Sequence, residues 1–275
     1  MGMTEQLIEP GRAERNYWTD IWRYRELFYF LAWRDILVRY KQTVIGVAWS
    51  VVRPLLTMII FTVIFSRVAK LHSAAAVPYA LLVMAGMLPW QFVSNSVSES
   101  SNSLAMNSNL ISKVYFPRLI VPAGSVITSF VDFAITLGLM GVMMIWYRFA
   151  PDWHLLALPF FVLLSFAFSF GVGLWFAALN VEYRDFRHII PFVVQFGLYI
   201  SPVGFSSSII PARWRLLYSF NPVVGVIDGF RWSLLRGQSA IWLPGLLISI
   251  VLTFAICAGG IWYFRKTERT FADVI

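Results

Sequence analysis

Long apolar runs are the feature that most constrains how this chain can fold. An α-helix rises about 1.5 Å per residue and the hydrocarbon core of a membrane is about 30 Å thick, so a span needs roughly 20 mostly apolar residues. Six runs are candidates: Val44 to Phe65, Pro78 to Val97, Leu119 to Tyr147, Leu155 to Leu179, Ile189 to Phe205 and Ile241 to Phe264. The fifth run is short and is interrupted by two prolines. The sequence therefore predicts an all-α polytopic membrane protein with six transmembrane helices.

The overall composition supports a membrane protein. Of the 275 residues 59% are hydrophobic and only 13% are charged, whereas soluble domains carry about 25% charged residues. So few charges cannot cover a water-soluble globule. This argues against a soluble enzyme, a disordered chain and a nucleic-acid binder, even though the net charge is +8. Cys257 is the single cysteine, so no intrachain disulfide can form.

The basic residues predict the orientation of the chain. An even number of spans puts both termini on one side, and cytoplasmic segments carry an excess of Lys and Arg. Most of the 22 Lys and Arg residues lie in segments that would then face inward, and fewer lie in the outer loops, Arg231 among them. Both termini are therefore predicted to be cytoplasmic. Residues 1–20 contain no apolar stretch and are expected to form a cytoplasmic tail without a cleavable signal.

Two stretches flank the spans without crossing. Residues 21–43 are predicted to form an amphipathic helix in the cytoplasmic interface, with Leu27, Phe30, Leu31, Trp33, Leu37 and Val38 on one side and Arg25, Asp35 and Arg39 opposite. Asp35 and Arg39 have the spacing of a helical ion pair. Within the transmembrane domain, residues 44–275, about 206–240 contain short apolar pieces around Asn221-Pro222. They predict short re-entrant helices before the last span, or equally an external loop with two packed helices.

Catalytic patterns are missing from the sequence. None of the four lysines follows a glycine, so no phosphate-binding P-loop can form, and no HExxH motif or Cys and His cluster indicates a metal site. We expect no cofactor in this chain. Asp132 lies near the middle of the third span, where a carboxylate is costly. It either acts in a transport pathway or gate, or is protonated or satisfied by neighbouring helices.

Five motifs are distributed along nearly the whole chain. In order they are RELFYFLAWRDILVRYKQTVIGVAWSVVRPLLTMIIF (Arg25 to Phe61), NLISKVYFPRLIVP (Asn109 to Pro122), NVEYRDFRHI (Asn180 to Ile189), NPVVGVIDGFRW (Asn221 to Trp232) and FRKTERTFADVI (Phe264 to Ile275). Together they resemble the membrane subunit of ABC-type polysaccharide exporters, and are most similar to its O-antigen branch. The resemblance implies a homodimer around a translocation channel, bound to two separate ATPase subunits. ATP and magnesium would then be used by the partner subunit.

The resemblance also implies roles for particular residues. A coupling helix over about 108–118 would place Lys113, Tyr115, Phe116 and Arg118 against the ATPase. A cytoplasmic gate or ATPase contact would contain Glu182, Arg184, Asp185, Arg187 and His188. Spans one and five would face the dimer axis, so the channel-lining aromatics would be Phe61, Phe65, Phe192, Phe196 and Tyr199. Arg34, Arg39 and Lys41 would contact lipid headgroups or a pyrophosphate.

The function expected from these observations is transport. The chain would conduct a lipid-linked polysaccharide of O-antigen type across a bacterial inner membrane to the periplasm, in contact with membrane lipids and with no nucleic acid. Three alternatives stay open: an exporter subunit for capsular polysaccharide or teichoic acid, a polytopic glycolipid-modifying enzyme, and a scaffolding membrane subunit without a pore.

Overall fold

The computed structural model describes residues 17–41, 46–70, 77–183 and 185–271, which form helices and their connections and contain no strand. The longer helices are α2 (Arg25–Lys41), α3 (Gly46–Thr62), α4 (Tyr79–Met106), α6 (Ile120–Trp146), α7 (Leu158–Glu182), α8 (Phe186–Ile200), α10 (Pro222–Leu234) and α11 (Leu243–Thr267). The shorter ones are α1 (Tyr17–Arg23), η2 (Val63–Val68), α5 (Ser108–Lys113), η3 (Trp153–Ala157), η4 (Ser207–Ile209) and α9 (Ala212–Tyr218).

Five of the described helical stretches are long and apolar enough to cross a membrane: Ala48–Val68, Tyr79–Met106, Ile120–Trp146, Trp153–Glu182 and Leu243–Thr267. They correspond to five of the six predicted spans. The remaining one, α8, has 15 residues and is therefore only about 22 Å long. It ends at Ile200, and Pro202 follows at once, which disfavours further helix. The chain then continues as a loop to Gly204, whose carbonyl accepts a hydrogen bond of 2.6 Å from the Tyr79 hydroxyl.

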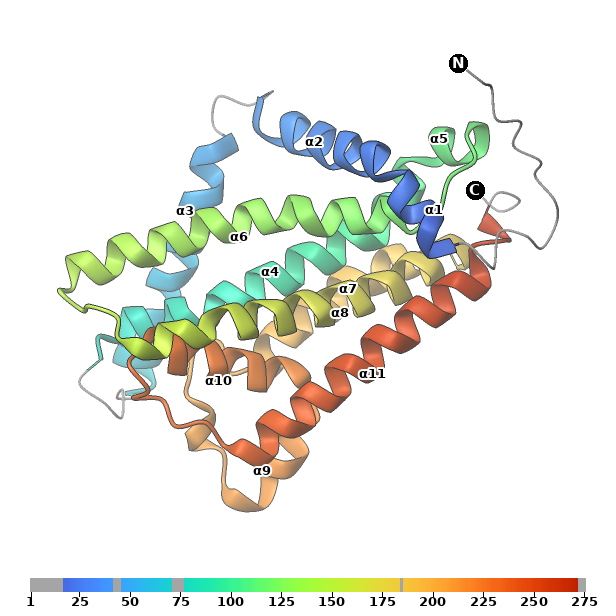
Figure 1. The fold of residues 1–275 in the computed structure, drawn as a ribbon. Coiled ribbons are helices and arrows are strands. Elements are labelled where there is room, and N and C mark those ends of the chain that lie inside the picture. The colour runs from blue at the N-terminus through green and yellow to red at the C-terminus, as the bar shows by residue number, and fades with distance from the viewer. Residues whose placement is uncertain (1–16, 42–45, 71–76, 184, 272–275) are drawn as a thin grey trace.

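The bundle has two distinct ends (Figure 1). At one end, called the α5 end, α1, α5 and the last turn of α11 lie together. The other end, called the α9 end, holds α9 and the first turn of α11, which line one cavity with α10. Helices α4, α7 and α11 run toward the α5 end, and α6 runs back. Successive long helices therefore cross the bundle in opposite directions, as the sequence predicted for membrane spans.

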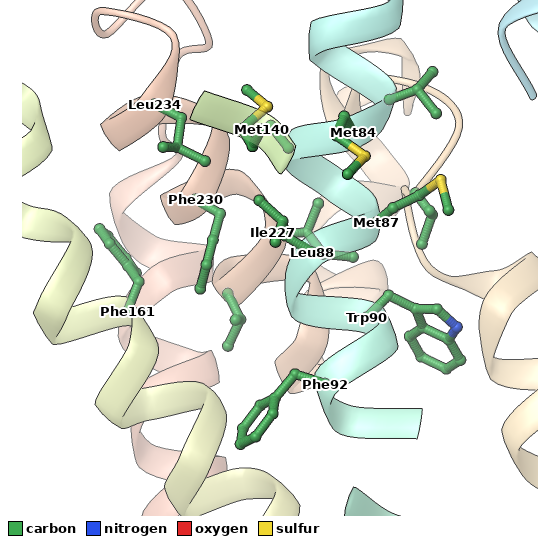
Figure 2. Close-up of a cluster of buried hydrophobic side chains, with 14 of the residues drawn as sticks. Met84, Met87, Leu88, Trp90, Phe92, Met140, Phe161, Ile227, Phe230 and Leu234 are labelled. Carbon is green, nitrogen blue, oxygen red and sulfur yellow. The ribbon is translucent and has the colours of Figure 1, made fainter. Parts of the chain in front are cut away.

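Helix α4 forms the centre of the bundle. Within its most apolar stretch 83% of the residues are buried, compared with 11% for α3 and η2. Figure 2 shows Leu88 and Phe92 of α4 on the side that faces Phe161 of α7 and Phe230 of α10, and Met87 on the other side of α4. By contrast, one face of α3 and one face of α8 carry exposed apolar side chains. These faces can only be stable in lipid or against another chain.

The two short helices before the last span have different environments. Twelve of the thirteen residues of α10 are buried, whereas no residue of α9 is. The Asn221 side chain caps α10 by accepting a hydrogen bond of 3.1 Å from the amide of Val223, and Pro222 occupies the first turn, where its missing N–H costs nothing. The turn falls at the predicted Asn221-Pro222. The depth of these helices in a membrane stays a prediction.

Helices α7 and α11 approach each other backbone to backbone. A Cβ atom at Gly171 would lie 2.5 Å from Cα of Cys257, and one at Gly260 would lie 2.4 Å from the carbonyl oxygen of Gly171. Small residues at such contacts let membrane helices pack closely, which is a main source of their attraction in lipid.

We therefore expect Gly171→Ala to destabilise the chain by about 1–3 kcal/mol, the usual cost of overpacking. The measurement is the thermal midpoint of the detergent-solubilised protein, followed by size-exclusion chromatography. Gly138→Ala in α6 is the matched control, because a Cβ atom there meets nothing within 4 Å. Equal midpoints for the two variants would show that the α7–α11 contact is not tight.

The apolar side predicted for α2 is divided between two surroundings. Leu27 and Leu31 pack against the bundle, whereas Phe30, Trp33 and Val38 are exposed, as an apolar side that meets lipid would be. Arg39, expected on the opposite side, points into the bundle, where it meets carboxylates of α4 and α6. At its C-terminal end α2 therefore directs a charged residue into the bundle. The expected pair between Asp35 and Arg39 is absent, because Asp35 bonds its neighbour Arg34 instead.

Candidate transport site

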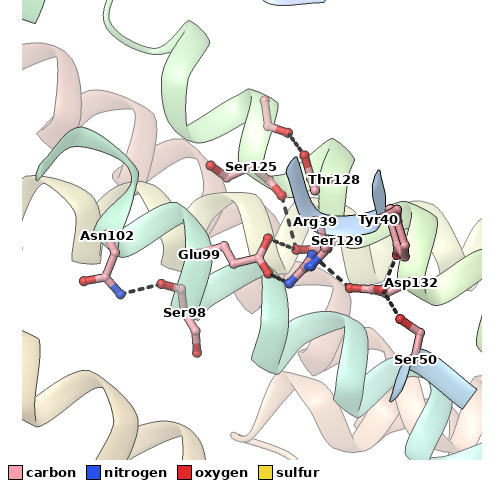
Figure 3. Close-up of polar contacts among 11 residues, drawn as sticks. Arg39, Tyr40, Ser50, Ser98, Glu99, Asn102, Ser125, Thr128, Ser129 and Asp132 are labelled. Atoms are coloured by element: carbon pink, nitrogen blue, oxygen red, sulfur yellow. Dashed lines mark hydrogen bonds and ion pairs between the residues drawn. The ribbon is translucent and has the colours of Figure 1, made fainter. Parts of the chain in front are cut away.

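A cluster of polar side chains joins the N-terminal helices to the bundle (Figure 3). The Arg39 guanidinium of α2 lies between two carboxylates, with Nη1 2.9 Å from Oδ2 of Asp132 and Nη2 paired with Oε1 of Glu99. Glu99 belongs to α4 and Asp132 to α6. One arginine therefore connects α2 to both central helices, and the three groups together carry one net negative charge when ionised.

Hydroxyl groups complete the cluster. Tyr40 of α2 and Ser50 of α3 both donate to Asp132, the serine over 3.1 Å, and Ser129 donates to Glu99 over 3.1 Å. Hydrogen bonds to ionised groups are about twice as strong as neutral ones. Of the two interpretations of Asp132 left open by the sequence, a carboxylate satisfied by neighbouring helices agrees with these contacts.

The three residues predicted to contact headgroups differ in their surroundings. Arg39 is engaged in the polar cluster. Arg34 bonds Asp35 over 2.7 Å and the side-chain oxygen of Asn107 over 2.8 Å. Lys41, by contrast, is exposed at the end of α2. Two of the three side chains therefore have partners inside the chain, and their contact with a headgroup or pyrophosphate stays a prediction.

The predicted coupling residues line a groove of about 1080 Å³ at the α5 end. The helical part is α5, which ends at Lys113, and residues 114–119 form a link of bends and a turn to α6. Lys113 and Tyr115 are exposed in the groove. Phe116 is buried in the smaller of the two apolar cores and anchors the link there, and its contact with an ATPase stays a prediction.

The opposite wall of this groove comes from α1 and the end of α11, which the sequence did not predict. Nη1 of Arg118 donates to the Glu268 carbonyl, and the Tyr17 hydroxyl donates to the Glu268 carboxylate over 2.8 Å. Burial raises the pKa of Glu268, although the bond from Tyr17 and the charges of Arg118 and Arg265 oppose the rise. Through Glu268 the link, α1 and α11 are tied together.

The predicted gate residues surround the junction of α7 and α8 at the same end. Glu182, Asp185, Arg187 and His188 are all exposed. Glu182 accepts a hydrogen bond of 3.1 Å from Tyr263 of α11. The described members form no ion pair with one another, and Arg184 lies outside the described residues. The described gate residues thus lie close together in the structure, and no described side chain bonds more than one of them.

The five predicted channel aromatics fall on α8 and on α3 with its continuation η2. On α8, Phe192 and Phe196 stack with ring centres 5.7 Å apart and are exposed together with Tyr199. On α3 and η2, Phe61 and Phe65 meet edge to face at 5.7 Å and are only half-exposed, because Phe65 packs over Gly204. The α8 residues are therefore free to meet a ligand or another chain, and the α3 pair mainly supports the loop after α8.

Arg231 of α10 is a residue that the sequence analysis misplaced. We counted it among the outer-loop charges, but its side chain is fully buried. Its nitrogens donate to the carbonyls of Leu82 at 3.2 Å, Val203 at 2.8 Å and Phe205 at 2.7 Å, which ties α10 to α4 and to the loop after α8. One sequence signal could have indicated a buried position for Arg231: Asp228 lies three residues before it within an apolar stretch.

These features define a helical membrane protein with an apolar face open to a partner, a basic groove at one end and no nucleotide-binding motif in its sequence. The family described as ABC-2 type transporter matches residues 26–235, and the chain belongs to this family. It is 26% identical over 250 residues to an O-antigen export system permease protein, RfbA, of Klebsiella pneumoniae, covering 88% of this chain and 92% of that protein.

Two further relatives extend the comparison. An RfbA of Myxococcus xanthus with the same description is 28% identical over 214 residues, covering 77% of this chain and 81% of that protein. The polysialic acid transport protein KpsM of Escherichia coli is 20% identical over 239 residues, covering 86% of this chain and 91% of that protein. The family resemblance seen in the sequence motifs is thereby confirmed.

Proposed function

We propose that the chain is the membrane-spanning permease subunit of an ATP-driven exporter, which moves a lipid-linked polysaccharide of O-antigen type across a bacterial inner membrane to the periplasm. The observation that carries this proposal is the similarity, over most of both chains, to two permeases named for O-antigen export. A capsular polysaccharide is the second candidate substrate. The lower identity to the polysialic acid transport protein supports it more weakly.

The proposed orientation puts the α5 end in the cytoplasm. Lys113, Arg118, Arg187, Arg265 and Lys266 all lie at this end, and basic residues are enriched on the cytoplasmic side of membrane proteins. The α9 end would then face the periplasm. Both chain ends would be cytoplasmic.

The channel would form between two copies of the chain. The exposed faces of α3 and α8 need a cover, and a second copy related by a twofold axis supplies one with identical chemistry. Phe192, Phe196 and Tyr199 on α8 would then border the path. Aromatic faces suit a sliding sugar chain because they offer apolar contact with few directional bonds.

ATP hydrolysis would come from two partner subunits that dock at the groove of the α5 end, and the partner would hold the ATP and magnesium. The contacts suggest how their motion reaches the channel. The link that carries Tyr115 is bonded through Arg118 to Glu268, which is bonded to α1. Helix α1 leads directly into α2, and α2 ends in the polar cluster next to the start of α3. A push on the link would therefore move α3 at the channel face.

The partner assignment is tested by gentle purification of the chain from its native membrane. We expect an ATPase with a P-loop to copurify in a one-to-one ratio. The double variant Lys113→Glu and Tyr115→Ala should lose most of this partner, because it removes the exposed charge and ring from the groove. Lys70→Glu, at the opposite end of the bundle, is the control and should retain it. Retention of the ATPase by all three proteins would contradict the groove as its docking site.

A further inference from the structure

A separate cavity of about 280 Å³ lies at the α9 end, away from the groove and from the α3 and α8 faces. Helices α9, α10 and α11 and the turn η4 enclose it. The residues that carry its chemistry are Ser207, Arg215, Ser219, Asp228 and Trp242. Its volume is at the lower limit of small-molecule sites, which suits one small ring at a time.

Asp228 is the unusual residue of this cavity. It is only 7% exposed, and its Oδ1 has no hydrogen-bond partner among the described residues. Buried polar atoms in native proteins almost always have a partner, so an exception requires an explanation such as an absent ligand or water. The Ser207 hydroxyl lies beside the Asp228 carboxylate, so the acceptor left without a donor is the Oδ1 atom alone.

The charges around Asp228 limit what that donor can be. Arg231 lies one turn further along α10, and its nitrogens are bonded to the three carbonyls described above. It therefore offsets the charge of Asp228 without bonding it. A second guanidinium, that of Arg215, lines the cavity and is held by the carbonyls of Ser208 and Ile210. Two neighbouring positive charges disfavour a cation, so the missing partner is a neutral donor such as a hydroxyl.

The remaining walls suit a sugar. Trp242 offers an aromatic ring. The Ser219 hydroxyl donates to the Arg215 carbonyl over 2.8 Å, so its oxygen is left to accept a hydrogen bond, and the Ser207 hydroxyl lies beside Asp228. A Cβ atom at Gly245 would lie 2.6 Å from both the Trp242 ring and the Ser219 hydroxyl, so the glycine lets these two groups come together. A carboxylate, a guanidinium, hydroxyls and an aromatic plane are together the groups that bind the hydroxyls and apolar face of a sugar ring.

We propose that this cavity binds a single sugar unit, with one sugar hydroxyl donating to Oδ1 of Asp228 and the ring lying against Trp242. The sugar is a neutral hexose or deoxyhexose. The proposal rests on the proposed function only for the source of the sugar, which would be the polymer as it emerges at the α9 end. The cavity would hold the emerging polymer against backward sliding.

The test uses the purified full chain in lipid nanodiscs, with saturation-transfer NMR of methyl α-D-mannoside, methyl β-D-galactoside and methyl α-L-rhamnoside. We expect transfer to at least one glycoside. Asp228→Asn should weaken that binding about tenfold or more, as expected for loss of one charge-assisted hydrogen bond. Trp242→Leu should also weaken glycoside binding. If Asp228→Asn does not fold, the Trp242 variant alone tests the proposed site. Asp152→Asn, in the loop before η3, is the control.

No transfer to any of the three glycosides, or equal binding by the wild type, Asp228→Asn and Trp242→Leu, would overturn the proposal and leave only an ordered water at Asp228. The experiment requires neither the ATPase nor export. A chain that binds a glycoside but proves dispensable for export would therefore refute the proposed function and keep the cavity site. A chain that exports polymer but binds no glycoside would refute the cavity site alone.

Discussion

Replacement of Arg231 with methionine should prevent most of the chain from accumulating as a stable, monodisperse protein. The Arg231 side chain is fully buried and is the hydrogen-bond donor to the carbonyls of Val203 and Phe205. Methionine fills a similar volume but donates nothing. Each buried acceptor left without a partner costs about 1–3 kcal/mol, and the loop after α8 would lose its attachment to α10. The measurement is the thermal midpoint and monodispersity of the solubilised protein.

Two variants make this result specific. Arg213→Met removes an exposed arginine of α9 and should leave the midpoint unchanged, since surface substitutions rarely matter. Gly86→Ala should destabilise the chain without removing any donor, because its Cβ atom would lie 2.6 Å from Nη2 of Arg231. If Arg231→Met unfolds at the wild-type temperature, the buried arginine has no structural importance and the assigned contacts are wrong.

Loss of Arg39 should have the second largest effect, on export as well as on stability. Arg39→Gln leaves Glu99 and Asp132 close together without their shared counter-charge. Breaking a fully buried pair costs about 3–5 kcal/mol, and the cost here is smaller because about a third of the Arg39 side chain is exposed. Helices α2 and α3 should then loosen from α4 and α6. Thermal unfolding and export by the variant measure the two consequences.

The charge balance of the cluster supplies the control. If repulsion between the carboxylates causes the damage, Asp132→Asn added to Arg39→Gln should restore part of the lost stability. Arg53→Gln changes an exposed arginine of α3 and should have little effect. A double variant that is less stable than Arg39→Gln alone would show that Asp132 contributes through its hydrogen bonds and not through its charge.

The lengths of the apolar runs predicted most of the long helices correctly. They failed to predict a helix end where side chains pack against protein and not against lipid. The second span was expected to end at Val97, but α4 continues to Met106 through a stretch rich in serine and asparagine. Ser100 and Ser103 there are buried against other helices, and a Cβ atom at Gly173 of α7 would lie 2.7 Å from the Ser100 hydroxyl. Hydropathy measures affinity for lipid, so it does not detect a helical segment whose polar side chains pack against other helices.

The sites were predicted less completely than the helices, for a physical reason. The pairing of Arg39 with Glu99 and Asp132 was not predicted, because these partners are distant in the sequence and pairing across such distances depends on tertiary structure. Arg231 was assigned to an outer loop because the apolar pieces around it are too short to span. Its acceptors are backbone carbonyls, which carry no sequence signal. By contrast, Lys113 at the end of α5 and Tyr115 in the link after it are exposed between two predicted spans, and their role in coupling stays a prediction.

The most direct test of the central claim is the sidedness of the polymer in cells that lack this chain. We expect lipid-linked polysaccharide to accumulate on the cytoplasmic face, inaccessible to an externally added lectin or antibody, and the surface polymer to disappear. Wild-type chain should restore the surface polymer, and the Lys113→Glu and Tyr115→Ala double variant should not. Normal surface polysaccharide in cells without the chain would contradict its role as the permease of a polysaccharide exporter.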